Sequence, residues 1–268
     1  MLTEAREVGI VEIRIKSQTI QESPLLEYLK AFYNLQGGTL VLDGTNNEET
    51  NKILAKATLS LIEQLGGGSV GLGWGHLIGS IVNYLEDEEP RKTSITDICP
   101  MIGNSGVPIR NYHPNENVRI IAKQIMASPH FLYTPAVAET QQDKELLTQT
   151  EQYKSILNLW ENLKVAIVNI GNHPSTPDLG SSARFGNLLS QNKAVGRLIA
   201  YYYNQEGKII TSDKDYVIQI PLEVLKKCPN VIGICSANTN SKALIGALKT
   251  GLLTHIVVRE KLLDNLEF

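Results

Sequence analysis

The chain has 268 residues, of which 42% are hydrophobic and 20% are charged, so it is long enough to bury one large α/β core. A formal net charge of -3 and a pI near 6.0 argue against a surface that binds nucleic acid over its whole area. Any contact with DNA would need a separate basic element. No apolar run resembles a signal peptide or could span a bilayer, so we expect a cytoplasmic protein with no membrane partner.

The first eighteen residues differ in pattern from the rest of the chain. Leu2 to Val8 has helical composition, and Ile10 to Ile15 alternates apolar with charged residues like a half-exposed strand. Two interpretations stay open. The segment is either a remnant of a winged-helix module or an arm that packs on the domain. We therefore divide the chain into a linker or remnant over residues 1–18 and a domain over residues 19–268.

From Ser23 onwards strands and helices alternate, which is typical of a wound, mainly parallel sheet. Helices are predicted at Pro24 to about Asn34, Asn46–Leu65, Leu77–Glu86, Pro114 to about Ala127, Glu139–Leu163, Pro221–Lys227 and Ser241–Leu248. Strands are predicted at Thr39–Asp43, Ser69–Leu72, within Ile95–Ile102, and at Val165–Ile170, Val231–Cys235 and His255–Val258. Two further strands, Ala194–Tyr203 and Lys208–Ile210, would flank a turn, and Gly171 to Gly186 is predicted to be a long irregular loop.

Val231 to Glu260 forms the clearest unit, because two short β-branched runs bracket one helical pattern. A covering helix implies that the two strands are parallel. The loop between the first strand and the helix, Ser236 to Ser241, is small and polar, and Lys242 follows in the first turn of the helix. Open parallel sheets bind ligands at the carboxyl ends of their strands, so we expect a ligand near this loop.

A glycine-rich loop, Gly71 to His76, follows another predicted strand and opens a helix. Backbone amides there could face a phosphate or carboxylate with the helix dipole behind them. The spacing of the glycines is not that of a dinucleotide fingerprint, and they could equally serve only a tight turn. Gly103 and Asn104 follow another predicted strand, and there Asn104 and Ser105 could either donate hydrogen bonds to sugar hydroxyls or simply satisfy the backbone of a turn. Lys242 alone is more often a solvated lysine.

The three cysteines, Cys99, Cys228 and Cys235, are far apart and lack the CxxC spacing of metal or redox sites. We expect them to be reduced and mostly buried, with no metal and no cofactor in the protein. No histidine has a carboxylate partner that the sequence identifies, so no catalytic residue is assigned.

Five short motifs, in this order and spacing, resemble the effector-binding domain of the SorC/DeoR-type sugar-binding transcriptional regulators. They are Ala5 to Val11, Gly73–Trp74–Gly75, Ile170–Gly171, Ala194–Val195–Gly196, and Lys242–Ala243 with Ala247–Leu248. The resemblance covers nearly the full chain. It implies a Rossmann-like, three-layer wound sheet similar to that of ribose-phosphate isomerases, glucosamine-phosphate deaminases and CoA transferases.

The resemblance also implies a function. The domain would bind a phosphorylated sugar as effector, form a homo-oligomer (a dimer or tetramer), and act on DNA through an amino-terminal head outside this chain. The residues that would contact the ligand are Gly73, Trp74, Gly75, His76, Leu77, Gly103, Asn104, Gly171, Asn172, Arg197, Asn238 and Lys242.

Several positions at this site depart from the family pattern. His76 and Leu77 stand where the family commonly has Arg or Gly and then Thr, and Asn238 and Thr239 replace a pair of glycines. Arg197 replaces an acidic residue and would add positive charge if it faces the pocket. Two alternatives stay open: a sugar-phosphate isomerase or deaminase of the same fold, and a ligand-free oligomerisation domain.

Overall fold

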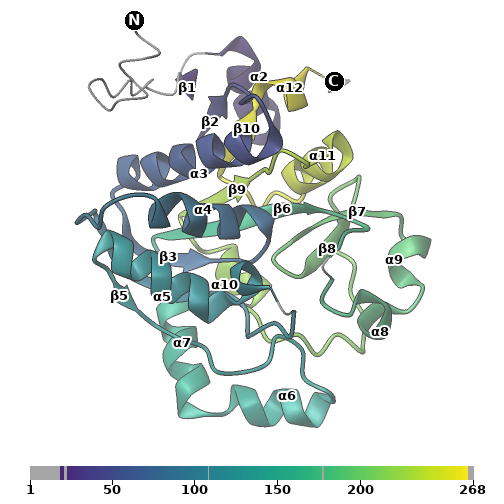
Figure 1. The fold of residues 1–268 in the computed structure, drawn as a ribbon. Helices are drawn as coiled ribbons and strands as arrows, with labels where there is room; N and C mark the ends of the chain where they lie inside the picture. The colour runs from purple at the N-terminus through teal and green to yellow at the C-terminus, as the bar shows by residue number, and fades with distance from the viewer. Residues whose placement is uncertain (1–18, 21–22, 108, 177, 265–268) are drawn as a thin grey trace, which may run out of the picture.

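The structure is a computed structural model that describes residues 19–20, 23–107, 109–176 and 178–264. The helix and strand predicted between Leu2 and Ile15 lie outside the described residues. Ten strands of the described chain belong to one sheet, whose main path runs β1-β2-β10-β9-β6-β3-β4-β5 (Figure 1). The strands are β1 (Thr19–Ile20), β2 (Gly37–Val41), β3 (Gly68–Leu72), β4 (Ile95–Pro100), β5 (Ser128–Pro129), β6 (Val165–Asn172), β7 (Ala194–Leu198), β8 (Tyr201–Asn204), β9 (Asn230–Ile234) and β10 (His255–Arg259).

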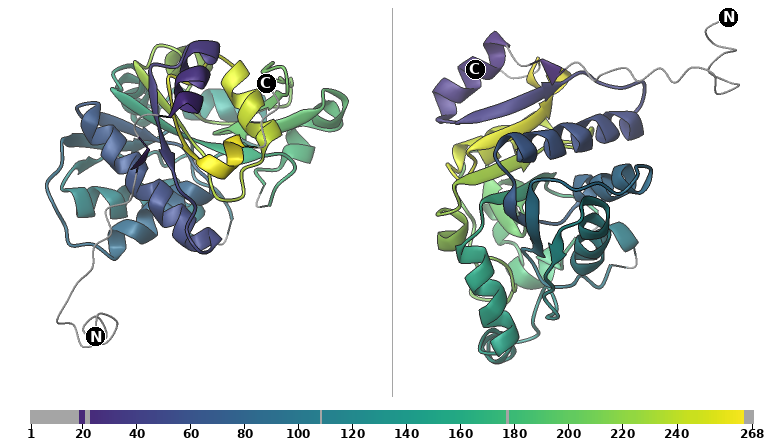
Figure 2. Two further views of the ribbon diagram at one scale, coloured as in Figure 1. Left: turned by 90° about the horizontal axis from the view of Figure 1, so that it is seen from above. Right: turned by 90° about the vertical axis from the view of Figure 1, so that its left-hand side faces the viewer.

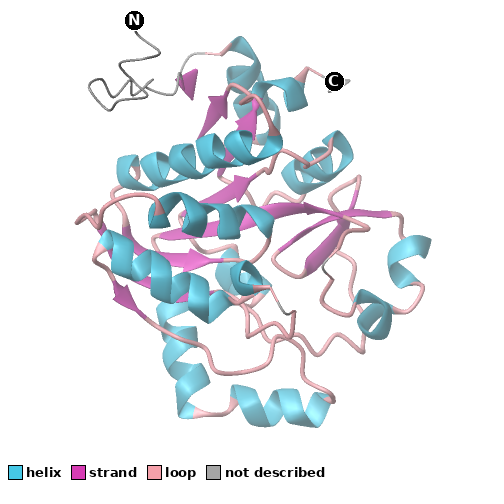
Figure 3. Ribbon diagram, viewed as in Figure 1, coloured by secondary structure: helices cyan, strands magenta, loops and turns pink. Residues whose placement is uncertain are grey.

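Every neighbouring pair on the path from β2 to β5 is parallel, as predicted, and β1 pairs with β2 antiparallel. Helices alternate with these strands along the chain (Figure 3). The helices are α2 (Pro24–Tyr33), α3 (Asn47–Gln64), α4 (His76–Glu86), α5 (Pro114–Ile125), α6 (Gln141–Thr148), α7 (Glu151–Glu161), α8 (Ser181–Phe185), α9 (Leu188–Gln191), α10 (Leu222–Leu225), α11 (Ser241–Lys249) and α12 (Glu260–Leu263), with a short 3-10 turn at Arg110–Tyr112.

The helices form two layers, one on each face of the sheet (Figure 2). Helices α3, α4 and α5 pack on one face around a single hydrophobic cluster, whereas α2, α7 and α11 pack on the other. Successive side chains of β6 alternate between these two clusters, with Ile167 in the first cluster and Ala166 and Val168 in the second. The fold is therefore the predicted three-layer α/β architecture.

The direction of winding changes at the centre of the sheet. Strands β3 and β6 are neighbours in the sheet. The strands that follow β3 in the sequence, starting with β4, are added on one side of this pair, whereas β9 and β10, which follow β6, are added on the other. In open α/β sheets the ligand crevice lies at the carboxyl ends of the strands at such a switch point. The fold therefore identifies the carboxyl ends of β3 and β6 as the place to look for a site.

The prediction of one long strand over Ala194–Tyr203 was wrong. The chain reverses at Ile199, whose φ of 55° is rare for a β-branched residue, and Ala194–Leu198 pairs antiparallel with Tyr201–Asn204. Hydrogen bonds from neighbouring side chains hold this turn: Trp74 Nε1 donates to Ile199 O, and the Ala200 amide donates to Gln219. Tertiary contacts, rather than turn-forming residues, fix the hairpin, so local sequence did not reveal it.

Two other boundaries also needed correction. The predicted helix over Glu139–Leu163 is two helices: α6 ends at Thr148, and Thr150 caps α7, where its hydroxyl accepts a hydrogen bond from Tyr153 N. The segment predicted as a loop from Gly171 to Gly186 is partly regular, since β6 continues to Asn172 and α8 begins at Ser181. No helix of the described chain is long and apolar enough to cross a membrane.

Candidate functional site

A polar cavity of about 240 Å³ lies at the switch point, where β3, β6 and β9 end. Its side chains come from the start of α4, the last residues of β6, the hairpin strand β7 and the loop before α11. The described residues that line it are His76, Tyr112, Asn169, Ile170, Gly171, Asn172, Ser175, Thr176, Arg197, Ser236, Asn238 and Thr239. None of these carries a carboxylate, so Arg197 gives the cavity a positive character.

Helix α4 begins at this cavity with an uncapped amino terminus. Its N-cap residue, Gly75, has no side chain to accept a hydrogen bond from the first backbone amides. These amides and the helix dipole favour a bound anion. The φ of 132° at Gly75 also requires glycine, and an added Cβ would lie 2.9 Å from Asn169 Nδ2. The glycine therefore allows the Asn169 amide to reach the helix terminus.

Asn169 is a buried amide on the wall of the cavity. Its side chain is 8% exposed, and its Oδ1 is buried without a hydrogen-bond partner among the described residues. Its Nδ2 lies between Gly75 and Gly171, so the amide is held against the cavity wall. Buried amides are nearly always hydrogen-bonded in native proteins. A ligand hydroxyl that donates a hydrogen bond to Oδ1 would satisfy this acceptor, and Nδ2 could donate to an acceptor of the same ligand.

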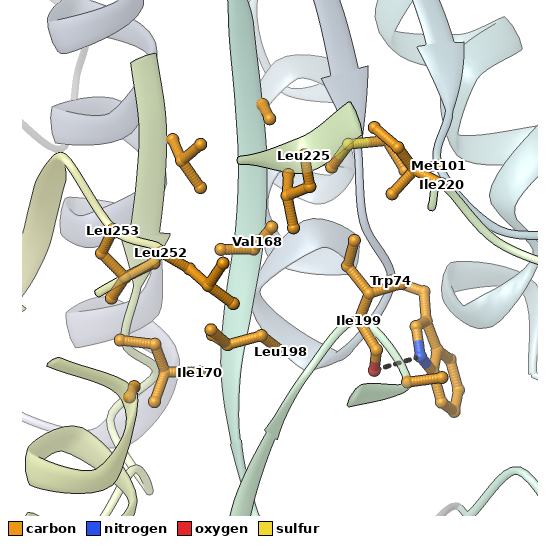
Figure 4. Packing of buried hydrophobic residues seen from close by; sticks show 14 of the residues in the cluster. Trp74, Met101, Val168, Ile170, Leu198, Ile199, Ile220, Leu225, Leu252 and Leu253 are labelled. Atoms are coloured by element: carbon orange, nitrogen blue, oxygen red, sulfur yellow. Dashed lines mark hydrogen bonds between the residues drawn. The ribbon is translucent and has the colours of Figure 1, made fainter. Parts of the chain in front are cut away.

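Arg197 brings a guanidinium to the same place from β7. Arg197 pairs with Gly171 across the antiparallel ladder, and a Cβ on Gly171 would lie 3.1 Å from Arg197 Nε. The guanidinium carbon lies 4.6 Å from the centre of the Trp74 ring, in a cation–π contact. The ring is itself fixed by its 3.1 Å hydrogen bond to Ile199 O (Figure 4). Trp74 therefore orients Arg197, which is 7% exposed, toward the cavity.

The opposite wall is the loop between β9 and α11, which amide side chains tie to β6 and α3. Asn172 donates through Nδ2 to Asn238 O and accepts from Asn240 N, at 2.8 and 3.0 Å. Asn51 of α3 accepts a hydrogen bond from Ala237 N at 2.8 Å, and its Nδ2 lies 3.1 Å from His76 Nε2. These contacts give the loop a defined position and orient the His76 ring.

A second, larger cavity of about 650 Å³ adjoins the polar cavity. The two share Thr176, which lies in the loop after β6. The described residues that line the larger cavity are Asn104, Ser105, Gly106, Val107, Pro135, Ala136, Val137, Thr176, Asp178, Leu179, Gly180, Ala183 and Arg184. Most of its walls are apolar, and its charged groups are Asp178 and Arg184.

Two titratable groups stabilise the loop between these cavities. Burial lowers the pKa of His173, whose ring packs edge-on against Tyr202. Burial raises the pKa of the Asp178 carboxyl. Hydrogen bonds from Ser181 and from the Tyr202 hydroxyl lower it by more, so the pKa lies below its usual value. At neutral pH the loop therefore holds a neutral histidine and an ionised aspartate.

The structure brings together most of the residues that sequence analysis selected. His76, Gly171, Asn172, Arg197 and Asn238 line the polar cavity. Trp74 and Gly75 support Arg197 and the start of α4, as described above. Gly73 lies behind them, where its amide donates to Ile167 O.

The remaining predicted residues lie elsewhere. Leu77 is fully buried in the cluster under α4, so only its backbone amide belongs to the helix terminus. Gly103 is buried against the Pro135 backbone, and Asn104 lines the larger cavity. Lys242 is exposed on the first turn of α11 and is not among the described lining residues of either cavity. Its contact with a ligand stays a prediction.

Sequence analysis missed several lining residues, and Asn169 is the most informative. The strand predicted at Val165–Ile170 is apolar apart from this one amide. A single polar residue in a strand buried on both faces is itself a signal, because its burial without a partner is costly. Ser236 and Thr239 lie in the loop where a ligand was expected, although neither was named as a contact. Tyr112 carried no comparable signal in the sequence.

A metal centre is not indicated by the described residues, which contain no group of three or more His, Cys, Asp or Glu side chains that could hold an ion. The three cysteines are free and buried. Asp43 and Asp97, the two carboxylates near strand ends, are engaged by Arg259 and His130 at 3.0 and 2.8 Å. His255 is a buried core residue that contacts Thr254.

Comparison with known proteins identifies the family. Residues 17–266 match the family described as "Putative sugar-binding domain". The chain belongs to this family. It is also 26% identical over 258 residues to the sorbitol operon regulator of Klebsiella pneumoniae, an alignment that covers 92% of this chain and 81% of that protein. The chain is thus a sugar-binding domain of the kind found in SorC/DeoR-type transcriptional regulators.

Solved structures share the fold of this domain. The full-length sorbitol operon regulator SorC from Klebsiella pneumoniae superimposes with a TM-score of 0.82 at 21% identity, covering 98% of this chain and 86% of that one. A DeoR family transcriptional regulator from Listeria monocytogenes gives a TM-score of 0.72 at 22% identity, with coverage of 90% and 97%. Both likenesses agree with the mainly parallel, three-layer architecture.

Proposed function

We propose that this sugar-binding domain senses a phosphorylated sugar in the polar cavity at the switch point and thereby controls a transcriptional regulator. The observation that carries this proposal is the convergence of three groups with N–H donors on one small cavity: the uncapped start of α4, the Asn169 side-chain amide and the Arg197 guanidinium. A phosphate group has enough acceptor oxygens to engage all three. The hydroxyl and amide side chains that complete the lining suit the hydroxyls of a sugar.

Regulation would follow from differential binding to two arrangements of the protein. A ligand held between α4 and the β9–α11 loop would favour the arrangement in which both are closed on it. In a homo-oligomer, a dimer or tetramer, this shift would change how the subunits pack and so alter the placement of DNA-binding heads outside this chain. The similarity to sorbitol operon regulators supports this role in transcription.

We propose a sensing role rather than catalysis by an isomerase or deaminase. These reactions need an acid and a base held across one substrate. Among the described residues that line the polar cavity, His76 is the only side chain of the His, Asp or Glu type, and its Nε2 already contacts Asn51. Turnover assays on pentose and hexosamine phosphates test this point, and measurable turnover would contradict it.

A thermal-shift screen of phosphorylated sugars tests the sensing proposal. A ligand present at about 100 times its Kd adds about 2.7 kcal/mol of stability, which corresponds to a rise in Tm of about 5–10 °C for a chain of this size. The Arg197→Gln variant should lose at least about tenfold in affinity, because a hydrogen bond to a charged group contributes about 1.5–3 kcal/mol.

The exposed Arg119, which pairs with Glu116 on α5, provides the matched control. Arg119→Gln removes a positive charge of the same kind away from the cavity and should leave the affinity unchanged. Lys242→Ala decides whether this exposed lysine contributes to binding. If no sugar phosphate raises the Tm of the wild-type protein, the proposal is wrong.

A further inference from the structure

The larger cavity beside the polar cavity suggests a longer ligand than one sugar phosphate. We infer that the effector is a disaccharide monophosphate, whose phosphorylated ring occupies the polar cavity and whose second, uncharged ring occupies the larger one. This inference rests on the proposed function, because it extends the same ligand from one compartment into the next. It is carried by the continuity, the size and the charge of the two compartments.

Continuity is provided by the loop that follows β6. Ser175 and Thr176 line the polar cavity, while Thr176 also lines the larger cavity together with Asp178 and Leu179. The loop is thus a shared wall that both compartments meet. A ligand held at the end of β6 would extend past Thr176 to enter the larger cavity.

The sizes of the compartments favour a ligand with two rings. The polar cavity, at about 240 Å³, is smaller than the roughly 300–1,000 Å³ that ligand pockets usually occupy, and the larger cavity, at about 650 Å³, lies within that range. A monosaccharide phosphate would leave the larger cavity without a role. A second ring would use it.

The walls of the larger cavity match the surface of a sugar ring. Val107, Pro135, Val137 and Leu179 supply apolar contacts of the kind that cover the C–H face of a pyranose. Asn104 stands among them and can exchange hydrogen bonds with hydroxyls, since its Nδ2 makes only a long 3.4 Å contact to Leu132 O. The lining therefore combines a large apolar area with few polar groups, which is common in small-molecule sites.

The charges in the larger cavity disfavour a second phosphate, because the one cation among its described lining residues is already paired with a carboxylate and Asp178 adds another. Arg184 is 2% exposed, and its charge is paired with Asp215, to which Nε donates at 2.8 Å. Its Nη2 donates to Ala200 O at 3.1 Å, and its Nη1 is buried without a hydrogen-bond partner among the described residues. Asp178 adds a carboxylate that would repel a second anion. The part of the ligand in this compartment is therefore uncharged, which separates a disaccharide monophosphate from a sugar bisphosphate.

Isothermal titration calorimetry on the full chain can test the inference with three groups of probes. The first group is trehalose 6-phosphate, cellobiose 6'-phosphate and lactose 6-phosphate, and the second is glucose 6-phosphate and galactose 6-phosphate. The third is fructose 1,6-bisphosphate. At least one disaccharide monophosphate should bind about tenfold or more tightly than its matching monosaccharide phosphate, a difference of about 1.4 kcal/mol. The bisphosphate should bind no more tightly than the monophosphates.

Gly106 offers a way to fill the larger cavity without disturbing the fold. A Cβ at Gly106 would meet no atom within 4 Å, and its φ is outside the left-handed region. Gly106→Phe should remove the advantage of the disaccharide and leave the affinity for monosaccharide phosphates unchanged. Gly106→Ala, the matched control, should change neither. Ala183→Trp, from the exposed residue on α8, provides a second blocking variant if Gly106→Phe folds poorly.

The outcomes separate this inference from the proposed function. If monosaccharide phosphates bind while no disaccharide binds more tightly, or if the bisphosphate binds best, the inference is overturned and the proposed function stands. If both blocking variants keep the full disaccharide advantage, the second ring lies elsewhere and the inference is also overturned. If no sugar phosphate binds in any group, the proposed function itself fails.

Discussion

The two cavities at the carboxyl edge of the sheet are built in different ways. The polar cavity is formed by strand ends and a helix start, where Gly75 and Gly171 let the side chains of Asn169 and Arg197 approach within van der Waals distance of the backbone. The larger cavity is formed mainly by loops, and a Cβ at Gly106 or Gly180 in its wall would meet no other atom. One compartment is tightly constrained, and the other has free space.

This difference suggests a division of roles within one site. A phosphate group is the same in every sugar phosphate, so the part of the site that binds it can be rigid and tied to the sheet. The rest of the sugar varies, and loops on a rigid scaffold change more readily than the scaffold itself. The polar cavity would then supply affinity for the phosphate, and the larger cavity would distinguish one sugar from another.

The largest expected effect comes from breaking the constrained compartment at Gly75. Gly75→Val places a β-branched residue at a φ of 132°, where strain costs about 1–3 kcal/mol, and drives its Cβ to 2.9 Å from Asn169 Nδ2. Overpacking in a buried region adds about 1–3 kcal/mol. We expect a lower free energy of unfolding in urea and no Tm increase with sugar phosphates.

The matched substitution in the larger cavity is Gly106→Val, which introduces the same side chain into open space. Its free energy of unfolding should stay within about 0.5 kcal/mol of the wild-type value, as for most surface substitutions. Equal destabilisation by the two substitutions would show that the compartments do not differ in packing as the structure indicates.

A smaller effect is expected from two buried amides that flank the polar cavity. Asn51 uses both ends of its amide, toward Ala237 N and His76 Nε2, whereas Asn169 has a buried Oδ1 without a partner among the described residues. Asn51→Leu should destabilise the protein by about 1–3 kcal/mol, because it leaves buried groups unpaired. Asn169→Leu should leave the free energy of unfolding unchanged or raise it.

The Asn169→Leu substitution should affect ligand binding differently from the way it affects folding stability. Asn169→Leu removes a donor to the ligand and should weaken sugar-phosphate binding about tenfold in calorimetry, given about 1.5–3 kcal/mol for a hydrogen bond to a charged group. A residue that is costly to the fold but favourable for the ligand marks a binding position. If Asn169→Leu instead destabilises the protein and leaves binding intact, Asn169 is a structural residue.

The order of the strands and helices could be predicted from the sequence because it depends on local patterns. The β-branched runs Val231–Cys235 and His255–Val258, with the helix between them, became β9, α11 and β10 with parallel pairing. The hairpin at Ile199 could not be predicted, because Trp74 and Gln219 hold its turn from more than 15 residues away in the sequence.

The same distinction applies to the site. Loops after strands were identifiable, since carboxyl ends of parallel strands converge on one edge. The role of Arg197 depended on the reversal at Ile199, which sets β7 against the end of β6, and the separate cavity at Asn104 depended on how the loop after β6 folds. Such contacts between distant segments are determined by tertiary packing, which one sequence does not display.

The smallest expected effect concerns the wall between the compartments, where His173 packs against Tyr202 and the Tyr202 hydroxyl donates to Asp178. Burial lowers the pKa of His173 below the ordinary value of about 6.5, so the unfolded chain binds a proton at a pH where the folded protein does not. Folding stability should therefore fall as the pH is lowered from above that value through the lowered pKa of the folded state.

His173→Phe keeps an aromatic ring against Tyr202 and removes the proton site, so urea unfolding between pH 7.5 and about pH 5 should show a shallower loss of stability. Burial also lowers the pKa of His255, which is present in both proteins. It too makes stability fall at lower pH, so the variant keeps part of the dependence of stability on pH. An identical slope in wild type and variant would mean that His173 stays solvated, and that the wall is more open than the structure shows.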